Sequence, residues 1–216
     1  DYPMASIRFH KFAIEGMQDI EKQTEKSKAF YFPYVEEKRG VADNLLIELA
    51  KNAAVVITDD YPTYFVPQMT AEAKGSIQTT YELVDSNGLL PIRIAEKEYV
   101  RAHDFRRFMH KNIEDFLVEV PEKDPLEYLN LKFDEKLLEP IFKKYELVDF
   151  NKVNTQDFLN NLNVDKSVEV SDVIGGYNAA KSRLDLFAKK GFNDYSKLRS
   201  HPSEDASSQL SPYFHF

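Results

Sequence analysis

The sequence predicts an α/β fold: part of a doubly wound parallel sheet, then a linker, then the start of an all-α segment. Helical and strand-like periods alternate through the first half of the chain. Residues 53–58 (AAVVIT) form a continuous apolar run, which is typical of a strand covered on both faces of a parallel sheet. Strands joined by helices of this length require right-handed crossovers, which build a doubly wound sheet.

The elements follow in order along this first half. Residues 6–25 carry an apolar stripe at helical spacing, and residues 29–35 are short, aromatic and β-prone. Asp43 is placed to cap a third element, a helix that buries Leu45, Leu46, Leu49 and Ala50. After the strand 53–58 we expect a helix over 64–73 with Gly75 as its C-cap, then a strand over 79–84.

Polar residues follow the two predicted sheet strands. Ligands of such sheets bind outside the carboxyl ends of the strands, which places Asp59, Asp60, Asp85 and Asn87 at a candidate rim. The alternative is that these side chains only cap helices and end strands. No G-x-G-x-x-G precedes a helix, which argues against a dinucleotide dehydrogenase.

The second half is predicted to be helical. Residues 99–118 form an amphipathic helix whose four cations could touch phosphate or simply face solvent. Residues 119–165 are charged and proline-containing, and their apolar positions fit short helices along a connection. Gly175 and Gly176 form a loop before a helix over residues 178–189.

The last stretch, residues 195–216 (YSKLRSHPSEDASSQLSPYFHF), gathers hydroxyls before an aromatic run. Ser207, Ser208 and Ser211 stand at a predicted helix start, where hydroxyls and backbone N–H groups suit an anion such as a phosphate. The alternative is that these serines mark only a turn and an N-cap.

Bulk properties exclude several classes of protein. The net charge of −8 argues against general nucleic-acid binding, and the acidic excess lies entirely before Lys166. The chain has no cysteine, which excludes disulfides and cysteine zinc sites and fits a reducing, cytoplasmic location. No window has the ~18 apolar residues of a membrane span. No metal site is predicted, because no two of the five histidines stand at i,i+4.

Several ordered strings resemble the DNA photolyase/cryptochrome family, most of all deoxyribodipyrimidine photolyases of the class II branch. The strings are RFHKFAIEGM (8–17), VVITDDYP (55–62), LVDSNGLLPIR (83–93) and the residues from Gly175 to the end. In the family the last one runs Tyr…Arg…(Thr/Ser)-Ser-x-Leu-Ser-Pro-Tyr-(Leu/Phe)-His-(Phe)-Gly. The chain opens on Asp1-Tyr2-Pro3 with no preceding strand and stops before that glycine, so we expect a fragment cut at both ends.

The resemblance implies a division into three parts. Residues 1–118 would be the Rossmann-like antenna domain, incomplete at its start, and residues 119–165 the interdomain linker. Residues 166–216 would begin the helical FAD-binding domain. An antenna chromophore is expected in the first domain, but its identity stays open and no residues are assigned to it.

The implied activity is light-driven repair of cyclobutane pyrimidine dimers in DNA, with reduced FAD donating one electron to a flipped-out dimer. On this mapping Tyr195 contacts the flavin, and Arg199 contacts phosphate of the damaged DNA. Ser200-His201 departs from the family's Asn/Asp pairing, which leaves the role of Arg199 less secure than the flavin contacts. The phosphate and ribityl portion would be held by Ser207, Ser208, Gln209, Leu210 and Ser211.

The sequence of residues 1–216 assigns no catalytic residue. The chain has no tryptophan, whereas family members reduce their flavin through tryptophans of the carboxy-terminal half. We therefore expect residues 1–216 alone neither to retain FAD nor to repair DNA, and we expect a monomer. Two alternatives stay open: a cryptochrome-like photoreceptor without repair activity, and a non-catalytic α/β binding module.

Overall fold

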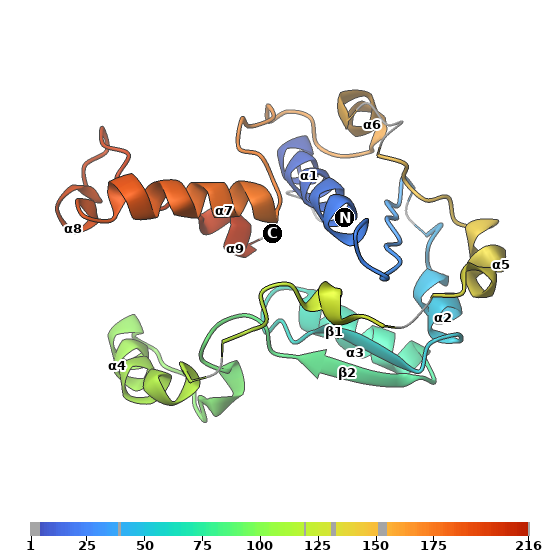
Figure 1. The fold of residues 1–216 in the computed structure, drawn as a ribbon, viewed down its shortest axis with the longest axis horizontal. Coiled ribbons are helices and arrows are strands. Elements are labelled where there is room, and N and C mark those ends of the chain that lie inside the picture. The colour runs from blue at the N-terminus through green and yellow to red at the C-terminus, as the bar shows by residue number, and fades with distance from the viewer. Residues whose placement is uncertain (1–4, 39, 119, 131–132, 151–154, 216) are drawn as a thin grey trace. The chain divides into compact units, whose positions relative to one another are not determined.

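A computed structural model describes residues 5–38, 40–118, 120–130, 133–150 and 155–215 (Figure 1). The predictions that concern Asp1–Pro3 and Phe216 lie outside these residues. The chain divides into two compact units. The first comprises Asp1–Val41, Leu126–Phe133 and Glu146–Phe216, and the second comprises Ala42–Pro125 and Asp134–Tyr145. The three-part domain division expected from the sequence remains a prediction.

The second unit contains a two-stranded parallel sheet. Strand β1 (Val55–Asp59) pairs with β2 (Thr80–Val84), with Val55 opposite Thr80 and Asp59 opposite Val84. Helix α3 (Val66–Ser76) is the crossover between them (Figure 1). The two strands and their helical connection are thereby confirmed as a mixed α/β arrangement with parallel pairing.

Two details of this βαβ unit differ from the sequence prediction. Val55 and Ile57 of β1 are 39% and 60% exposed, so the strand is not covered on both faces among the described residues. Gly75 lies inside α3 rather than at its C-cap, which is the extended residue Ile77. A glycine marks a helix end only where a left-handed conformation is needed, and here the chain leaves the helix directly into β conformation.

The other helices of the second unit are short. Helix α2 (Leu45–Ala50) packs against α5 (Glu139–Phe142), and Asn44 rather than Asp43 occupies the N-cap of α2. Helix α4 (Ala102–Asn112) is shorter than predicted because a 3₁₀ turn, η2 (Ile113–Phe116), follows it. The remaining 3₁₀ turns are η1 (Ile92–Ile94), η3 (Pro125–Tyr128, at the boundary of the units) and η4 (Glu135–Leu138).

The first unit is built around helix α1 (Ile7–Thr24), as the apolar stripe predicts. Helix α6 (Thr155–Asn161) packs on it, so residues of the expected linker contribute to this core. Ile7 is tied to the same region by its N–H, which donates to the carbonyl of Asp165 at 2.7 Å. The buried cluster consists of Ile7, Ile14, Val148, Phe150, Leu159 and Leu162.

The strand predicted over residues 29–35 is wrong, because this segment has no regular secondary structure. Pro33 lacks the N–H that a ladder requires, and its carbonyl instead accepts from the N–H of Val148 at 2.9 Å. Tyr31 and Val35 pack against the buried cluster. Burial raises the pKa of the Tyr31 hydroxyl, with a further contribution from the charge of Glu21.

The double glycine precedes helix α7 (Tyr177–Leu186), as expected. A Cβ on Gly175 would lie 2.0 Å from the carbonyl oxygen of Phe12, so only glycine allows this approach to α1. Gly176 has a φ of +96° and brings the chain into α7. Helix α7 continues as a π-helical turn, η5 (Phe187–Gly191), and is followed by α8 (Tyr195–Leu198) and α9 (Ser211–His215).

Two acidic residues of α1 fix the start of α7. The carboxylate of Asp19 accepts hydrogen bonds from the backbone N–H of Asn178 at 2.9 Å and from its side-chain amide at 2.5 Å. Glu15 accepts from the N–H of Gly175 at 2.9 Å. Carboxylates satisfy the open N–H groups of a helix start and favour its dipole, so α1 sets the direction in which α7 leaves.

Candidate functional site

The serine segment, residues 205–211, connects the turn after α8 to helix α9. Ala206 is its buried anchor at 4% exposure, whereas Ser207, Gln209 and Ser211 are exposed and Ser208 and Leu210 are half-buried. Gln209 adopts a φ of +52°, in the left-handed region. A non-glycine residue in this region marks a bend that other contacts must maintain.

Arg183 of α7 supplies those contacts. Its Nη2 donates to Asp205 Oδ1 at 2.8 Å and to the carbonyl of Ser207 at 3.3 Å. Its Nε donates to the carbonyl of Ser208 at 3.1 Å. Asp205 Oδ1 also accepts from the Gln209 side-chain amide at 2.5 Å, which links both ends of the bend to one carboxylate. Figure 1 shows the resulting placement of α9 next to α7.

In this arrangement most hydrogen-bond donors of the serine segment have no protein acceptor among the described residues. Among the described residues, no protein group bonds the hydroxyls of Ser207 and Ser211 or the backbone N–H groups of residues 207–209. The Ser208 hydroxyl is the exception, since it accepts a long bond of 3.5 Å from the N–H of Leu210. The segment therefore offers neutral donors to solvent, while the carbonyls of Ser207 and Ser208 and the carboxylate of Asp205 are engaged by Arg183.

Tyr213 attaches α9 to the rest of the first unit. Its hydroxyl donates to the carbonyl of Ile174 at 2.8 Å, and its ring lies 5.2 Å from the ring of Phe12. Burial raises the pKa of the Tyr213 hydroxyl; the charge of Arg183 lowers that pKa and the charge of Glu15 raises it. The tyrosine is therefore held neutral, as a donor to Ile174.

Tyr195 and Arg199 form a second group, in and just after α8. The Arg199 guanidinium lies 5.7 Å from the centre of the Tyr195 ring, a cation–π distance. The other neighbour of this ring is Phe187, which stands edge-on at 5.7 Å. Arg199 is exposed and has no acidic partner among the described residues, so its charge is open to an anion.

The structure thus brings Tyr195 to Arg199 and brings Ser207, Ser208 and Gln209 to Arg183. No hydrogen bond, ion pair or ring contact between described residues joins the two groups. Arg183 and Asp205 are the residues that sequence reasoning missed. The sequence does place Arg183 on a predicted helix shortly before the serine segment. The contact between them, however, depends on how residues 199–204 turn the chain back toward that helix, which the sequence pattern does not specify.

The predicted rim residues do gather at the carboxyl ends of β1 and β2, where they mostly bond one another. Asp59 accepts from the hydroxyl of Ser86, and Asn87 donates its side-chain amide to the carbonyl of Asp60 at 2.9 Å. Asp85 accepts from the N–H of Ile92 at 2.6 Å. The interpretation of these side chains as loop-organising residues fits these bonds.

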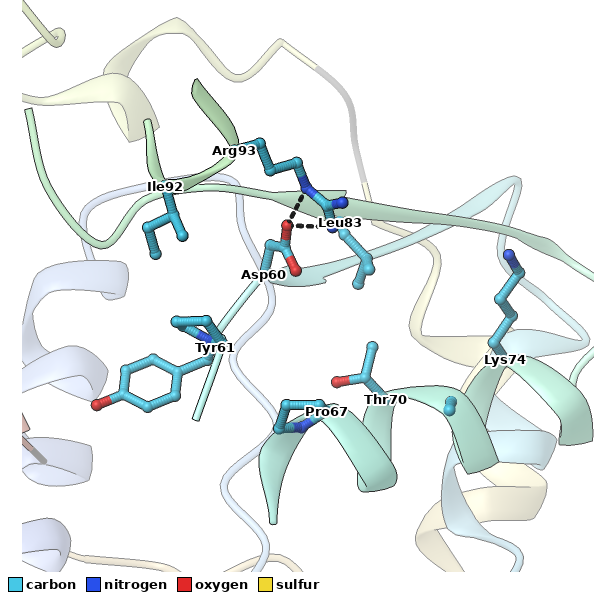
Figure 2. A pocket seen from close by; sticks show the side chains of 10 residues that line it. Asp60, Tyr61, Pro67, Thr70, Lys74, Leu83, Ile92 and Arg93 are labelled. Atoms are coloured by element: carbon cyan, nitrogen blue, oxygen red, sulfur yellow. Dashed lines mark hydrogen bonds and ion pairs between the residues drawn. The ribbon is translucent and has the colours of Figure 1, made fainter. Parts of the chain in front are cut away.

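Beside this rim lies an open pocket of about 470 Å³ (Figure 2). Asp60 faces it and pairs with Arg93, whose Nε and Nη2 lie 2.7 and 2.5 Å from Asp60 Oδ2. The other side of the pocket is formed by α3, with Pro67, Thr70 and Lys74. Its walls are largely apolar and its acid is neutralised by an arginine.

The described residues contain no cluster of three or more potential metal ligands and no helix long and apolar enough to cross a membrane. The described residues form a mixed α/β arrangement, and the hydroxyl-rich serine segment is an irregular stretch that leads into helix α9.

No protein-family model matches the chain. The chain is 25% identical over 217 residues to a deoxyribodipyrimidine photo-lyase of Methanothermobacter thermautotrophicus, covering 100% of this chain and 44% of that protein. It is also 25% identical over 218 residues to a deoxyribodipyrimidine photo-lyase of Potorous tridactylus, covering 98% of this chain and 37% of that protein. The chain is thus similar to deoxyribodipyrimidine photo-lyases along nearly its whole length. It spans less than half of the length of these relatives.

Proposed function

We propose that the protein carrying this chain is a deoxyribodipyrimidine photo-lyase that repairs cyclobutane pyrimidine dimers in DNA with light and FAD. Its similarity to two proteins of that name along nearly the whole chain supports this activity. The single structural observation that carries the proposal is the serine segment, where exposed hydroxyls and N–H groups have no partner among the described residues. Such a donor set suits the diphosphate of a dinucleotide cofactor.

The donor chemistry fits this group. Ser207, Ser211 and the N–H groups of residues 207–209 would hold the phosphate and ribityl portion, with Ser208 and Leu210 completing the segment. The one carboxylate in the segment, Asp205, is paired with Arg183, which offsets its negative charge next to a phosphate. When bound, reduced FAD supplies the excited-state electron for dimer splitting.

The second group has a different task in this proposal. The Tyr195 ring, 39% exposed, offers an aromatic contact for the flavin moiety. Arg199 keeps an unpaired guanidinium at the surface, which suits bidentate binding of a DNA phosphate. Stacking on Tyr195 restricts the side chain of Arg199 and so lowers the entropy lost on binding.

The test uses the full-length protein with Ser207→Ala and Ser211→Ala combined. Hydrogen bonds to a charged group contribute about 1.5–3 kcal/mol each, so we expect the affinity for FAD to fall at least tenfold. Flavin absorbance per protein after purification and a fluorescence titration measure it. Ser196→Ala, an exposed serine of α8 outside the segment, is the matched control and should bind FAD as the wild type does.

Three results would contradict parts of this proposal. A colourless full-length protein would favour the non-catalytic α/β binding module. Wild-type affinity in the double serine variant would remove the serine segment from the site. Flavin binding without restoration of thymine absorbance in an illuminated dimer-containing oligonucleotide would replace repair by a cryptochrome-like light-sensing role.

The remaining expectations belong to the same proposal. Damaged DNA is the partner, the protein acts as a monomer in the cytoplasm, and an antenna chromophore of undetermined identity accompanies FAD. Residues 1–216 alone are expected to be colourless after purification. Light-scattering mass measurement and the absorption spectrum of the full-length protein test the oligomeric state and the antenna.

A further inference from the structure

The guanidinium of Arg183 bonds the serine segment on its carbonyl side. The side chain is 19% exposed and reaches two successive carbonyls, those of Ser207 and Ser208, from one helix. Each of these carbonyls shares a peptide plane with the N–H of the next residue. Both peptide bonds are trans, because the described backbone contains no cis peptide.

In a trans peptide the carbonyl and the N–H point in opposite directions. Arg183 draws the carbonyls of Ser207 and Ser208 toward α7, so the N–H groups of Ser208 and Gln209 are directed away from α7. Neither N–H has a protein partner among the described residues. Without Arg183, the two peptide planes could rotate and direct carbonyl oxygens, which repel a phosphate, to the same place.

The positive charge of Arg183 is already paired with a carboxylate. Asp205 pairs with it at 2.8 Å and holds the Gln209 side-chain amide at 2.5 Å, which supports the left-handed φ of Gln209. The arginine therefore acts through geometry rather than as a free cation, in contrast to Arg199, which has no acidic partner in the described part of the chain. Three acceptors in different directions require the planar fork of a guanidinium, which a lysine cannot reproduce.

We infer that Arg183 is a positioning residue that orients the peptide planes of residues 207–209 so that their N–H groups can bind the phosphate of the cofactor. This inference rests on the proposed function, and nothing in the sequence motif of the serine segment points to it. Arg183 itself is not expected to touch the cofactor.

The test compares Arg183→Lys in the full-length protein with wild type. Lysine keeps the charge and most of the aliphatic stem, so α7 is expected to fold. We expect at least tenfold weaker FAD binding. In flavin-free protein we expect at least threefold faster chymotryptic cleavage at Leu210 and Tyr213. Lys181→Gln, which removes an exposed cation two residues away on α7, is the control and should change neither quantity.

Asp205→Asn provides a second variant that keeps an acceptor oxygen for Arg183 and Gln209. Because the contacts to the two carbonyls remain, its affinity for FAD should stay within threefold of wild type. A folded Arg183→Lys protein with wild-type affinity and wild-type cleavage would overturn the inference alone, provided that the double serine variant loses FAD. A wild-type protein that binds no FAD would instead overturn the proposed function and this inference with it.

Discussion

The serine segment and the edge of the sheet differ in how their polar groups are used. At the carboxyl ends of β1 and β2, carboxylates, an amide and an arginine bond one another: Asp60 with Arg93, and Asp85 with the N–H of Ile92. In the serine segment Arg183 engages the carbonyls of Ser207 and Ser208 and the carboxylate of Asp205, and the N–H groups of residues 207–209 remain open among the described residues. Both regions had been candidate sites on the basis of sequence position.

The difference teaches that a cluster of polar residues at a strand end is not by itself a binding site. A side chain whose hydrogen bonds are already satisfied must lose them before it can bind a ligand, and this loss opposes binding. Unsatisfied N–H groups held in a fixed direction require no such exchange with protein partners. The serine segment is therefore the better candidate for ligand binding, and the rim is the better candidate for maintaining a loop.

The serine segment and the edge of the sheet are also held in place by different helices and strands. The serine segment depends on α7, whose start is fixed to α1 by Gly175, Glu15 and Asp19. The sheet depends on the pairing of β1 with β2 and on the α3 crossover. Changes at these supports should therefore affect one unit and leave the other unchanged.

The largest expected effect comes from Gly175→Ala. The added Cβ would lie 2.0 Å from the Phe12 carbonyl oxygen and 2.9 Å from its carbon, both backbone atoms that cannot turn aside. We expect a loss of about 3 kcal/mol in the free energy of unfolding of the first unit, measured by urea denaturation. Flavin binding by the full-length protein should fall with it.

Gly75→Ala is the matched control in the other unit. No atom lies within 4 Å of its added Cβ, and Gly75 lies inside α3. Alanine in a helix is favoured over glycine by about 1 kcal/mol, so this variant should be slightly more stable than wild type. Equal responses of the two glycine variants would contradict the different supports of the two regions.

A smaller effect is expected for Asp85→Ala at the rim. The substitution removes the acceptor of the Ile92 N–H at 2.6 Å and of the longer Asn87 bonds at 3.4 Å. We expect about 0.5–1.5 kcal/mol lower stability, because the Ile92 N–H loses its hydrogen-bond acceptor, and unchanged FAD affinity. Glu82→Ala, an exposed carboxylate of β2, should stay within about 0.5 kcal/mol of wild type. Loss of FAD from the Asp85 variant would return the rim to the candidate site.

The smallest effect concerns the contact of α2 with the residues that follow α5. Glu48 accepts from Lys144 Nζ at 2.5 Å and from the Tyr145 hydroxyl at 3.4 Å. The hydrogen bond from Lys144 lowers the pKa of Glu48 below its ordinary value of 4.5 and raises that of Lys144 above 10.5. The stabilisation is therefore present above pH 4.5 and is lost as the pH falls through the lowered pKa of Glu48.

Lys144→Met should return the pKa of Glu48 toward its ordinary value, as measured by NMR titration of the carboxyl carbon. Lys143→Met, at the exposed neighbouring position, is the control and should leave the pKa of Glu48 lowered. The effect on stability at neutral pH should be slight, because surface ion pairs contribute little. An unchanged Glu48 pKa in the Lys144 variant would mean that another group lowers it.

The hydrophobic pattern of short sequence stretches correctly predicted several helices and strands. The stripe of residues 6–25 gave α1, the apolar run gave β1, and the double glycine marked the start of α7. The strand expected over residues 29–35 failed because β-propensity cannot supply a partner strand, and Pro33 removes a donor. Asp43 and Gly75 are not the caps, because α2 begins one residue later, after Asn44, and α3 continues through Gly75 to Ser76 before the extended residue Ile77.

By itself the sequence determined the mixed α/β class of the chain and its similarity to deoxyribodipyrimidine photo-lyases. Helices and strands follow from the hydrophobic period, and the similarity follows from the order of particular residues, including those around the serines. Tertiary structure alone decided which polar groups stay open. Whether a hydroxyl, an N–H or a carboxylate is available depends on the partner that folding brings to it. Arg183 meets Ser207 and Ser208 from positions 24 and 25 residues away, and no local pattern encodes that encounter.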